Sequence, residues 1–505
     1  MRNWSDAPLR LGTAKAAFGS GLAEVVARVL AVVLAIVTAR TLEPGEVGLL
    51  GLAVIVTGVI SMIGYYPETA AIAARGETDH NRRALAALTL RILLLASLLV
   101  LLAVSFPLLA HYLIGGSASA TEFRRLVLLL SWAPVLECLS AYPQVILQRR
   151  LDLRFLAWIQ VVQSVVFVGV ATVLLFLGQG YLGVAWANLT GAAGVLLIVW
   201  SRLLTSKWLR FEGWPGRGLW KEMLRGSSRV FVGGFGGYLG ARLDNLLVAG
   251  AMGPTVMSYY SMAWTASRTP TGILSRAINF VLVPTFARIQ DDTERIERGI
   301  QECLYYSYMV LAPACAVLFV CAPDLVTTII GPKWIPAVPA LRLMSITVLV
   351  GPLLDSSNAM LIGIGRAHLS GVSALVRIIA LLLLIKPLVL RWSVIGGAWG
   401  DLISALASTV ALLVIARLIN RDIKWPVASA LAVPVAAAFC SGILTWTIGG
   451  YLGPGLRRLV FQIGILFLSY PFIIAGLGGR TRLMSLAVLL RGVFLSRVAT
   501  AESQG

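Results

Sequence analysis

Residues 182–188 read Leu-Gly-Val-Ala-Trp-Ala-Asn, and residues 395–401 repeat this pattern as Ile-Gly-Gly-Ala-Trp-Gly-Asp. Three further pairs of stretches correspond in the same order along the chain: 42–53 with 252–263, 107–115 with 323–331, and 132–137 with 350–355. All four separations fall between 210 and 218 residues. Four collinear matches at one spacing predict a fold built from two copies of the same unit.

The composition predicts that both copies lie in a membrane. Of the 505 residues, 58% are hydrophobic and only 13% are charged, which is unlike a water-soluble domain. A helix needs about 20 apolar residues to cross a bilayer. Stretches of this kind predict about 14 transmembrane helices, at residues 15–39, 47–66, 85–106, 124–146, 157–177, 182–201, 228–250, 256–284, 299–321, 337–361, 371–390, 396–416, 426–447 and 458–477. The predicted fold class is an all-α integral membrane protein.

The net charge of +19 follows the alternation of the loops. Lys and Arg gather in every second loop, for example at Arg149 and Arg150 or at Arg417 and Arg421. Because such loops stay in the cytoplasm, we predict cytoplasmic N- and C-termini, and no nucleic-acid partner is expected. A cleavable signal peptide is not expected either, because residues 1–14 are polar and basic and the following apolar stretch is too long.

The duplication predicts the division into domains. We assign residues 1–204 to an N-terminal six-helix lobe, 205–226 to a cytoplasmic connection and 227–417 to a C-terminal six-helix lobe. Six is an even number, so both lobes enter the membrane from the same side as parallel repeats, an arrangement typical of transporters. Residues 418–478 form two additional transmembrane helices, and 479–505 form a cytoplasmic tail with the pattern of an interfacial helix.

Charged side chains inside the spans are the candidate functional residues, because each costs about 2.5–3.5 kcal/mol at a helix centre. Arg268 lies near the middle of the span 256–284, too deep to reach the membrane surface. Arg276 and Asn279 follow on roughly the same stripe. We predict that these residues face a central cavity, with extension of Arg276 to the cytoplasmic surface as the alternative.

Two other spans carry charges. Glu24 and Arg28 lie one helical turn apart on the same face of the first span. They either neutralise each other and stabilise packing or line a cavity. Arg242 and Asp244, in the seventh span, point to different faces, so a local ion pair does not explain both.

The repeat also places carboxylates at matching positions. Glu137 and Asp355 each follow a proline by three residues, and Asp401 corresponds to Asn188. These matching residues are candidates for ion coupling, Glu137 and Asp355 first among them, with structural capping of broken helices as the alternative. Glu24 and Asp244 join them as candidates for ion coupling.

Residue patterns typical of catalysis are missing from the sequence. His80, His111 and His368 are far apart in the predicted topology, and the cysteines have no metal-ligand spacing. The glycines at 233–240 follow no β-strand, so they indicate helix packing rather than a phosphate-binding loop. No catalytic residue, metal site or cofactor is expected.

Several motifs resemble those of the Wzx-type oligosaccharide flippases, most closely the colanic-acid-exporter type, within the multidrug/oligosaccharidyl-lipid/polysaccharide superfamily. They extend through about residue 420 and comprise Arg40–Ala53, Gln148–Phe155, Asp244–Gly253 with Tyr260, Val283–Gln290 and Ile330–Trp334. The resemblance implies alternating access between two six-helix lobes of a bacterial inner-membrane protein. The implied substrate is an undecaprenyl-pyrophosphate-linked oligosaccharide for polysaccharide (lipopolysaccharide or exopolysaccharide) biosynthesis and export. Implied partners are membrane lipids and the polymerase and chain-length machinery.

Arginines suit such a substrate, because guanidinium groups bind pyrophosphate through paired hydrogen bonds. The resemblance to lipid II flippases implies cavity arginines in the first, second and eighth spans. Arg28 and Arg268 match the first and the eighth, whereas the second span has no arginine and Arg242 is the substitute. The resemblance also implies that the last two helices form a groove for the lipid tail.

Two other classes of function compete with a flippase. An ion-coupled small-molecule or multidrug antiporter shares the fold, but twelve spans and a cavity for cations are typical of that class. A membrane-embedded glycosyltransferase, polymerase or ligase is expected to carry a large outer loop with catalytic carboxylates. Short loops and mid-membrane arginines favour the flippase.

Overall fold

The computed structural model describes residues 26–73, 80–114, 117–150, 152–206, 213–290, 292–419 and 427–479. Every regular element in these ranges is a helix. Nine of these helices are long and apolar enough to cross a membrane, or up to ten if a bent pair counts as one span. The all-α, multi-pass membrane fold is confirmed, and the number of fourteen spans stays a prediction.

The chain forms two compact units. The first comprises Met1–Arg242 and Gly253–Ser258, and the second comprises Leu243–Met252 and Tyr259–Gly505. The lobe boundaries predicted from the repeat stay a prediction. The sequence 479–505, predicted as a tail, lies outside the described residues except for Gly479.

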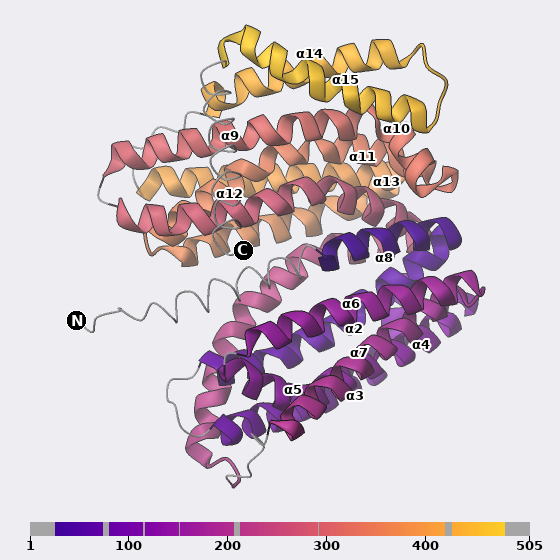
Figure 1. The fold of residues 1–505 in the computed structure, drawn as a ribbon, viewed down its shortest axis with the longest axis vertical. Helices are drawn as coiled ribbons and strands as arrows, with labels where there is room; N and C mark the ends of the chain where they lie inside the picture. Colours follow the sequence, from indigo (N-terminus) through magenta and orange to yellow (C-terminus); the bar gives the residue numbers. More distant parts are fainter. Residues whose placement is uncertain are drawn as a thin grey trace, which may run out of the picture. The chain divides into compact units, whose positions relative to one another are not determined.

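The first unit is a bundle of long helices that lie side by side (Figure 1). Residues 26–41 are helical, and α8 begins inside the predicted connection. Helix α6 packs along α7, and α2 along α3. The named helices are α2 (Pro44–Ala73), α3 (His80–Ile114), α4 (Ser117–Leu130), α5 (Trp132–Arg149), α6 (Leu153–Phe176), α7 (Gly180–Thr205) and the first part of α8 (Arg217–Arg288).

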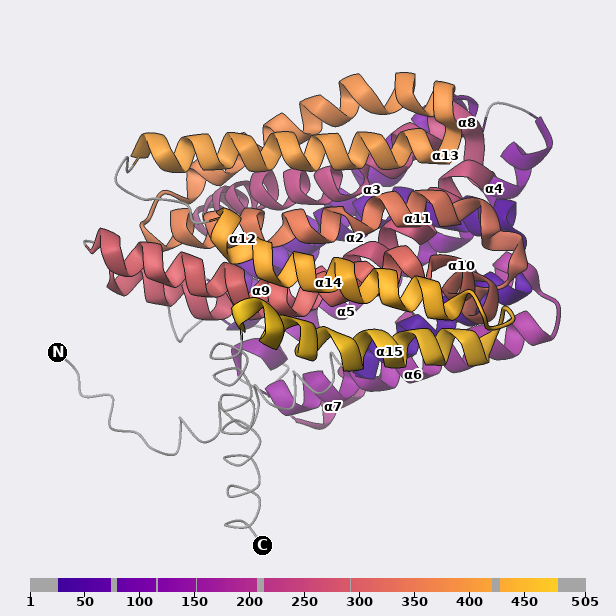
Figure 2. The same ribbon diagram turned by 90° about the horizontal axis from the view of Figure 1, so that it is seen from above.

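The second unit continues α8 and adds the C-terminal helices. Helix α14 packs against α9 and α15, and Figures 1 and 2 show α14 and α15 together along one side of this unit. The elements are α9 (Thr293–Val320), α10 (Ala322–Leu325), η1 (Val326–Ile330), η2 (Pro332–Ala337), α11 (Val338–Ser345), α12 (Thr347–Gly363), η3 (Ala367–Leu369), α13 (Ser370–Ile419), α14 (Val427–Gly449), α15 (Leu456–Ile474) and η4 (Ala475–Gly479).

Backbone breaks divide the two longest helical stretches. Gly253 interrupts α8 with φ 84° and ψ 179°, a conformation open to glycine. Ser393 interrupts α13 with φ 52° and ψ −130°. Gly253 and Ser393 each lie in the gap between two predicted spans. The helix axis therefore changes direction where the apolar sequence is interrupted.

The repeated stretch 395–401 allows close packing after the break in α13. A Cβ on Gly396 would lie 2.0 Å from the carbonyl oxygen of Leu388, in the preceding half of the same helix. A Cβ on Gly397 would lie 2.8 Å from the ring of Tyr260 on α8. The glycine pair therefore lets the second half of α13 approach both the first half of α13 and α8.

We expect Gly397→Ala to destabilise the protein by about 1–3 kcal/mol, because the added methyl group overlaps the buried Tyr260 ring. The midpoint of thermal unfolding in detergent measures this effect. Gly464→Ala is the matched control, since a Cβ there meets nothing within 4 Å. Equal midpoints for the two variants would contradict the packing argument.

Candidate functional site

The second unit contains a carboxylate shared by two arginines. Asp401, on the second half of α13, has a side chain that is 0% exposed. Arg268 of α8 places Nη2 3.2 Å from both carboxylate oxygens. Arg377, on the first half of α13, places Nη2 2.9 Å from Oδ1. The carboxylate therefore links three helical segments by charge-assisted hydrogen bonds: part of α8 and the two halves of α13.

A second aspartate completes this cluster. Asp244 is also fully buried and interacts electrostatically with Asp401 and Arg377. Tyr260 donates its hydroxyl to Asp244 Oδ2 at 3.0 Å, and Asn245 donates its backbone N and its Nδ2 to Oδ1 at 2.8 and 3.0 Å. The cluster holds two arginines and two aspartates, so their formal charges balance, which lowers the cost of burying them.

The guanidinium of Arg268 has several partners, but one of its hydrogen-bond donors has none among the described residues. Its guanidinium carbon lies 5.9 Å from the centroid of the Trp264 ring, within the range of cation–π attraction. The buried Nε atoms of Arg268 and Arg377 have no hydrogen-bond partner among the described residues. A buried donor without a partner costs about 1–3 kcal/mol, so an added acceptor would be favourable here.

The next turns of α8 carry a second polar contact. Ser275 donates its hydroxyl to Asp355 of α12, and Asn279 donates Nδ2 to the Ser275 carbonyl oxygen at 2.8 Å. Thus Arg268, Ser275 and Asn279 all make polar interactions along one helix.

The first unit carries a comparable contact at its matching carboxylate. Ser61 of α2 interacts with the carboxylate of Glu137 of α5, the counterpart of the contact between Ser275 and Asp355. In addition, Arg91 Nη2 of α3 lies 3.8 Å from Glu137 Oε2, and the Arg91 side chain is only 7% exposed. The duplicated sequence therefore produces a duplicated serine–carboxylate contact.

The remaining predicted residues are placed as follows. Arg28 is exposed on the helix 26–41, and Arg242 is half-buried on α8; both belong to the first unit. Glu24 lies outside the described residues, and so does the side chain of Arg276. Within the described ranges, no group of three or more His, Cys, Asp or Glu side chains could hold a metal ion.

Sequence reasoning missed two arginines, the buried Arg91 and the half-buried Arg377. Both interrupt long apolar stretches, the same signal that identified Arg268. Their partners are distant in the sequence, so the signal could have predicted burial but not pairing with Glu137 and Asp401.

The fold is similar to the folds of solved membrane transporters. The solved structure of the lipid II flippase MurJ in an inward closed conformation aligns with 92% of this chain and 99% of its own, with a TM-score of 0.73 and 14% identity. A multidrug resistance MATE family transporter of the MOP superfamily, inward-facing, aligns with 77% of this chain and 95% of its own, with a TM-score of 0.61 and 17% identity. At these identities, the likeness concerns the fold.

The sequence profile of the polysaccharide biosynthesis protein family matches residues 37–339, more than half of the chain, which therefore belongs to that family. The lipopolysaccharide biosynthesis protein WzxC of Escherichia coli K12 is 29% identical over 26% of this chain and 27% of its own length. The teichuronic acid biosynthesis protein TuaB of Bacillus subtilis 168 is 23% identical over 54% and 55%. The matches thus span about half or less of these relatives. They confirm the resemblance to Wzx-type flippases carried by the sequence motifs.

We expect Asp401→Asn to destabilise the protein by about 3–5 kcal/mol, because two half-buried arginines lose their shared, fully buried carboxylate. The double variant Asp401→Asn/Arg377→Gln removes one positive charge as well. It should regain about 0.5–3 kcal/mol relative to the single variant. Thermal unfolding of the purified variants measures both changes.

Glu294→Gln provides the control, since its side chain is 79% exposed and pairs with an exposed arginine. A wild-type midpoint for Asp401→Asn, or strictly additive losses in the double variant, would show that the cluster is not coupled by charge.

Proposed function

We propose that the protein translocates an undecaprenyl-pyrophosphate-linked oligosaccharide across the bacterial inner membrane by alternating access, for polysaccharide biosynthesis and export. Family membership and the resemblance to Wzx-type flippases support this proposal. The observation that carries it is Arg268 of α8. Its side chain is 22% exposed, and its guanidinium is held on the fully buried carboxylate of Asp401.

The geometry suggests how the pyrophosphate would be bound. Arg268 contacts Asp401 through Nη2 alone, at 3.2 Å, and its Nε has no partner among the described residues. A phosphate group could accept paired hydrogen bonds from this guanidinium. Arg377 would remain on Asp401 at 2.9 Å and keep that carboxylate compensated. Exchange of Arg268 from carboxylate to phosphate would then leave no buried charge unpaired.

The other predicted residues complete the proposed site. Arg28, Arg242 and Arg276 would add positive charge for the pyrophosphate, and Asn279 would bind sugar hydroxyls. Carboxylates would couple transport to an ion gradient, and the candidates are Glu24, Asp244, Glu137 and Asp355.

Topology and partners follow from the same proposal. The Lys- and Arg-rich loops would lie in the cytoplasm together with both termini. Translocation breaks no covalent bond, so the protein would act without enzymatic chemistry. The polymerase and chain-length machinery of the pathway would use the translocated product.

We expect Arg268→Gln to reduce polysaccharide export at least about 30-fold, since loss of one member of a charge-assisted contact costs about 2–5 kcal/mol. Cells in which the variant replaces the native gene are assayed for surface polymer and for accumulated lipid-linked repeat units. Arg268→Gln/Asp401→Asn keeps the cluster neutral, so it separates lost phosphate binding from misfolding. It should reach the membrane and still fail to export.

Arg391→Gln, an exposed arginine outside the cluster, is the control and should export normally. Normal export by the neutral double variant would refute the role of Arg268. Resistance to cationic dyes without a polysaccharide phenotype would instead support an antiporter. Glycosyl transfer by the purified protein would support an enzyme.

A further inference from the structure

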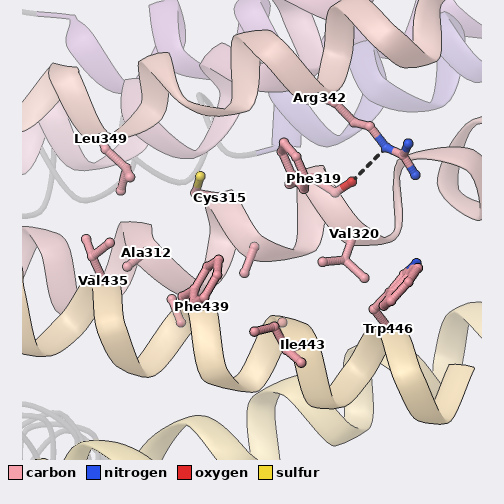
Figure 3. A pocket seen from close by; sticks show the side chains of 13 residues that line it. Ala312, Cys315, Phe319, Val320, Arg342, Leu349, Val435, Phe439, Ile443 and Trp446 are labelled. Atoms are coloured by element: carbon pink, nitrogen blue, oxygen red, sulfur yellow. Dashed lines mark hydrogen bonds between the residues drawn. The ribbon is translucent and has the colours of Figure 1, made fainter.

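The second unit contains an apolar groove with an arginine at one end. The groove has a volume of about 510 Å³ and lies between α9, α11–α12 and α14. Figure 3 shows Arg342 and Trp446 at one end and Leu349 and Val435 at the other. Helix α9 contributes Ala312, Cys315, Ala316, Phe319 and Val320.

The first unit contains a groove of nearly the same size, about 480 Å³. It lies between α3 and α4–α5 and also has one arginine, Arg124. Helix α3 contributes Leu99, Leu102, Ala103, Phe106 and Pro107.

The two grooves are copies of each other. Phe106 corresponds to Phe319 at a separation of 213, and the same separation relates Leu99, Leu102 and Ala103 to the α9 lining residues Ala312, Cys315 and Ala316. Directly after Phe106 the separation grows to 216, since Pro107 corresponds to Pro323. Arg124 corresponds to Arg342 at a separation of 218, the same separation as between Glu137 and Asp355. The duplication therefore preserves the groove together with its arginine.

No ion pair joins Arg124 or Arg342 to a carboxylate within the part of the chain that the structure describes. Arg342 donates Nε to the Phe319 carbonyl oxygen at 3.1 Å, and its terminal amino groups make no hydrogen bond to a described residue. An arginine next to apolar surface in a bilayer can form an ion pair with the phosphate of a lipid headgroup.

We propose that each unit carries a binding site for one bilayer phospholipid, with an acyl chain in the groove and the phosphodiester on Arg124 or Arg342. A single guanidinium matches the single charge of a phosphodiester. Helix α14, which has no counterpart in the duplication, borders only the second groove, yet the two volumes are similar. Both grooves are therefore formed by the duplicated helices, and the second groove does not depend on the presence of α14. This inference does not depend on the proposed function.

The test uses two photoactivatable probes with the same diazirine-bearing acyl chains: phosphatidylglycerol and diacylglycerol, which lacks the phosphate. The purified full-length protein is reconstituted in phosphatidylcholine vesicles with either probe and irradiated, and the labelled peptides are mapped. We expect phosphatidylglycerol to label α3 and α9 about fivefold more than diacylglycerol does, as one arginine–lipid contact predicts. Arg124→Gln and Arg342→Gln should each abolish this preference at its own groove only.

Ala103→Trp and Ala316→Trp fill the grooves without removing the arginines, and each should suppress labelling by both probes at its own site. Arg125→Gln and Arg391→Gln, at exposed arginines that line neither groove, should label as the wild type does. Equal labelling by the two probes in the wild type, or unchanged labelling in the tryptophan variants, would overturn the proposal. Displacement of the probe by undecaprenyl pyrophosphate at low molar ratio would also overturn it and assign the grooves to the lipid-linked substrate.

Discussion

The packing of the second unit depends on one buried carboxylate, that of Asp401. Asp401 is fully buried, and a charge without water is tolerated only when opposite charges and hydrogen bonds replace its hydration. Arg268 and Arg377 supply both, from α8 and from the first half of α13. Three segments must therefore pack together for this carboxylate to be stable. The close packing of Gly396 and Gly397 makes that approach possible.

The duplication and the departures from it have different consequences. Both units contain a serine–carboxylate contact and an apolar groove lined by one arginine, Arg124 or Arg342. These features therefore belong to the architecture that the two repeats share. The arginine cluster does not follow the repeat. The residue that corresponds to Asp401 is Asn188, which is uncharged and cannot compensate two arginines. The asymmetry thus concentrates buried charge in the second unit.

Composition and periodicity sufficed to predict an all-helical membrane protein, because apolar length alone determines which segments enter a bilayer. They also singled out Arg268 as a charged residue within an apolar stretch, since its distance from the ends of that stretch can be counted along a helix. They did not reveal that Arg268 and Arg377 share Asp401. The sequence gives a residue's depth, whereas pairing depends on which helices become neighbours and how each is rotated. The two arginines are 133 and 24 residues from Asp401, so tertiary packing alone decides the contact.

The stability of the folded protein does not by itself explain why these positions hold charged residues. Apolar residues of similar volume often replace a buried ion pair at no cost in stability, and they would hold α8 against α13 as well. Under the proposed function, the four charged residues would hold Arg268 in position and would keep Asp401 compensated by Arg377 when Arg268 moves to the substrate. A site that binds and releases an anionic headgroup needs a guanidinium that is pre-organised but still exchangeable. A shared carboxylate provides both properties, whereas an isolated ion pair would leave an uncompensated aspartate in the membrane each time the arginine moved.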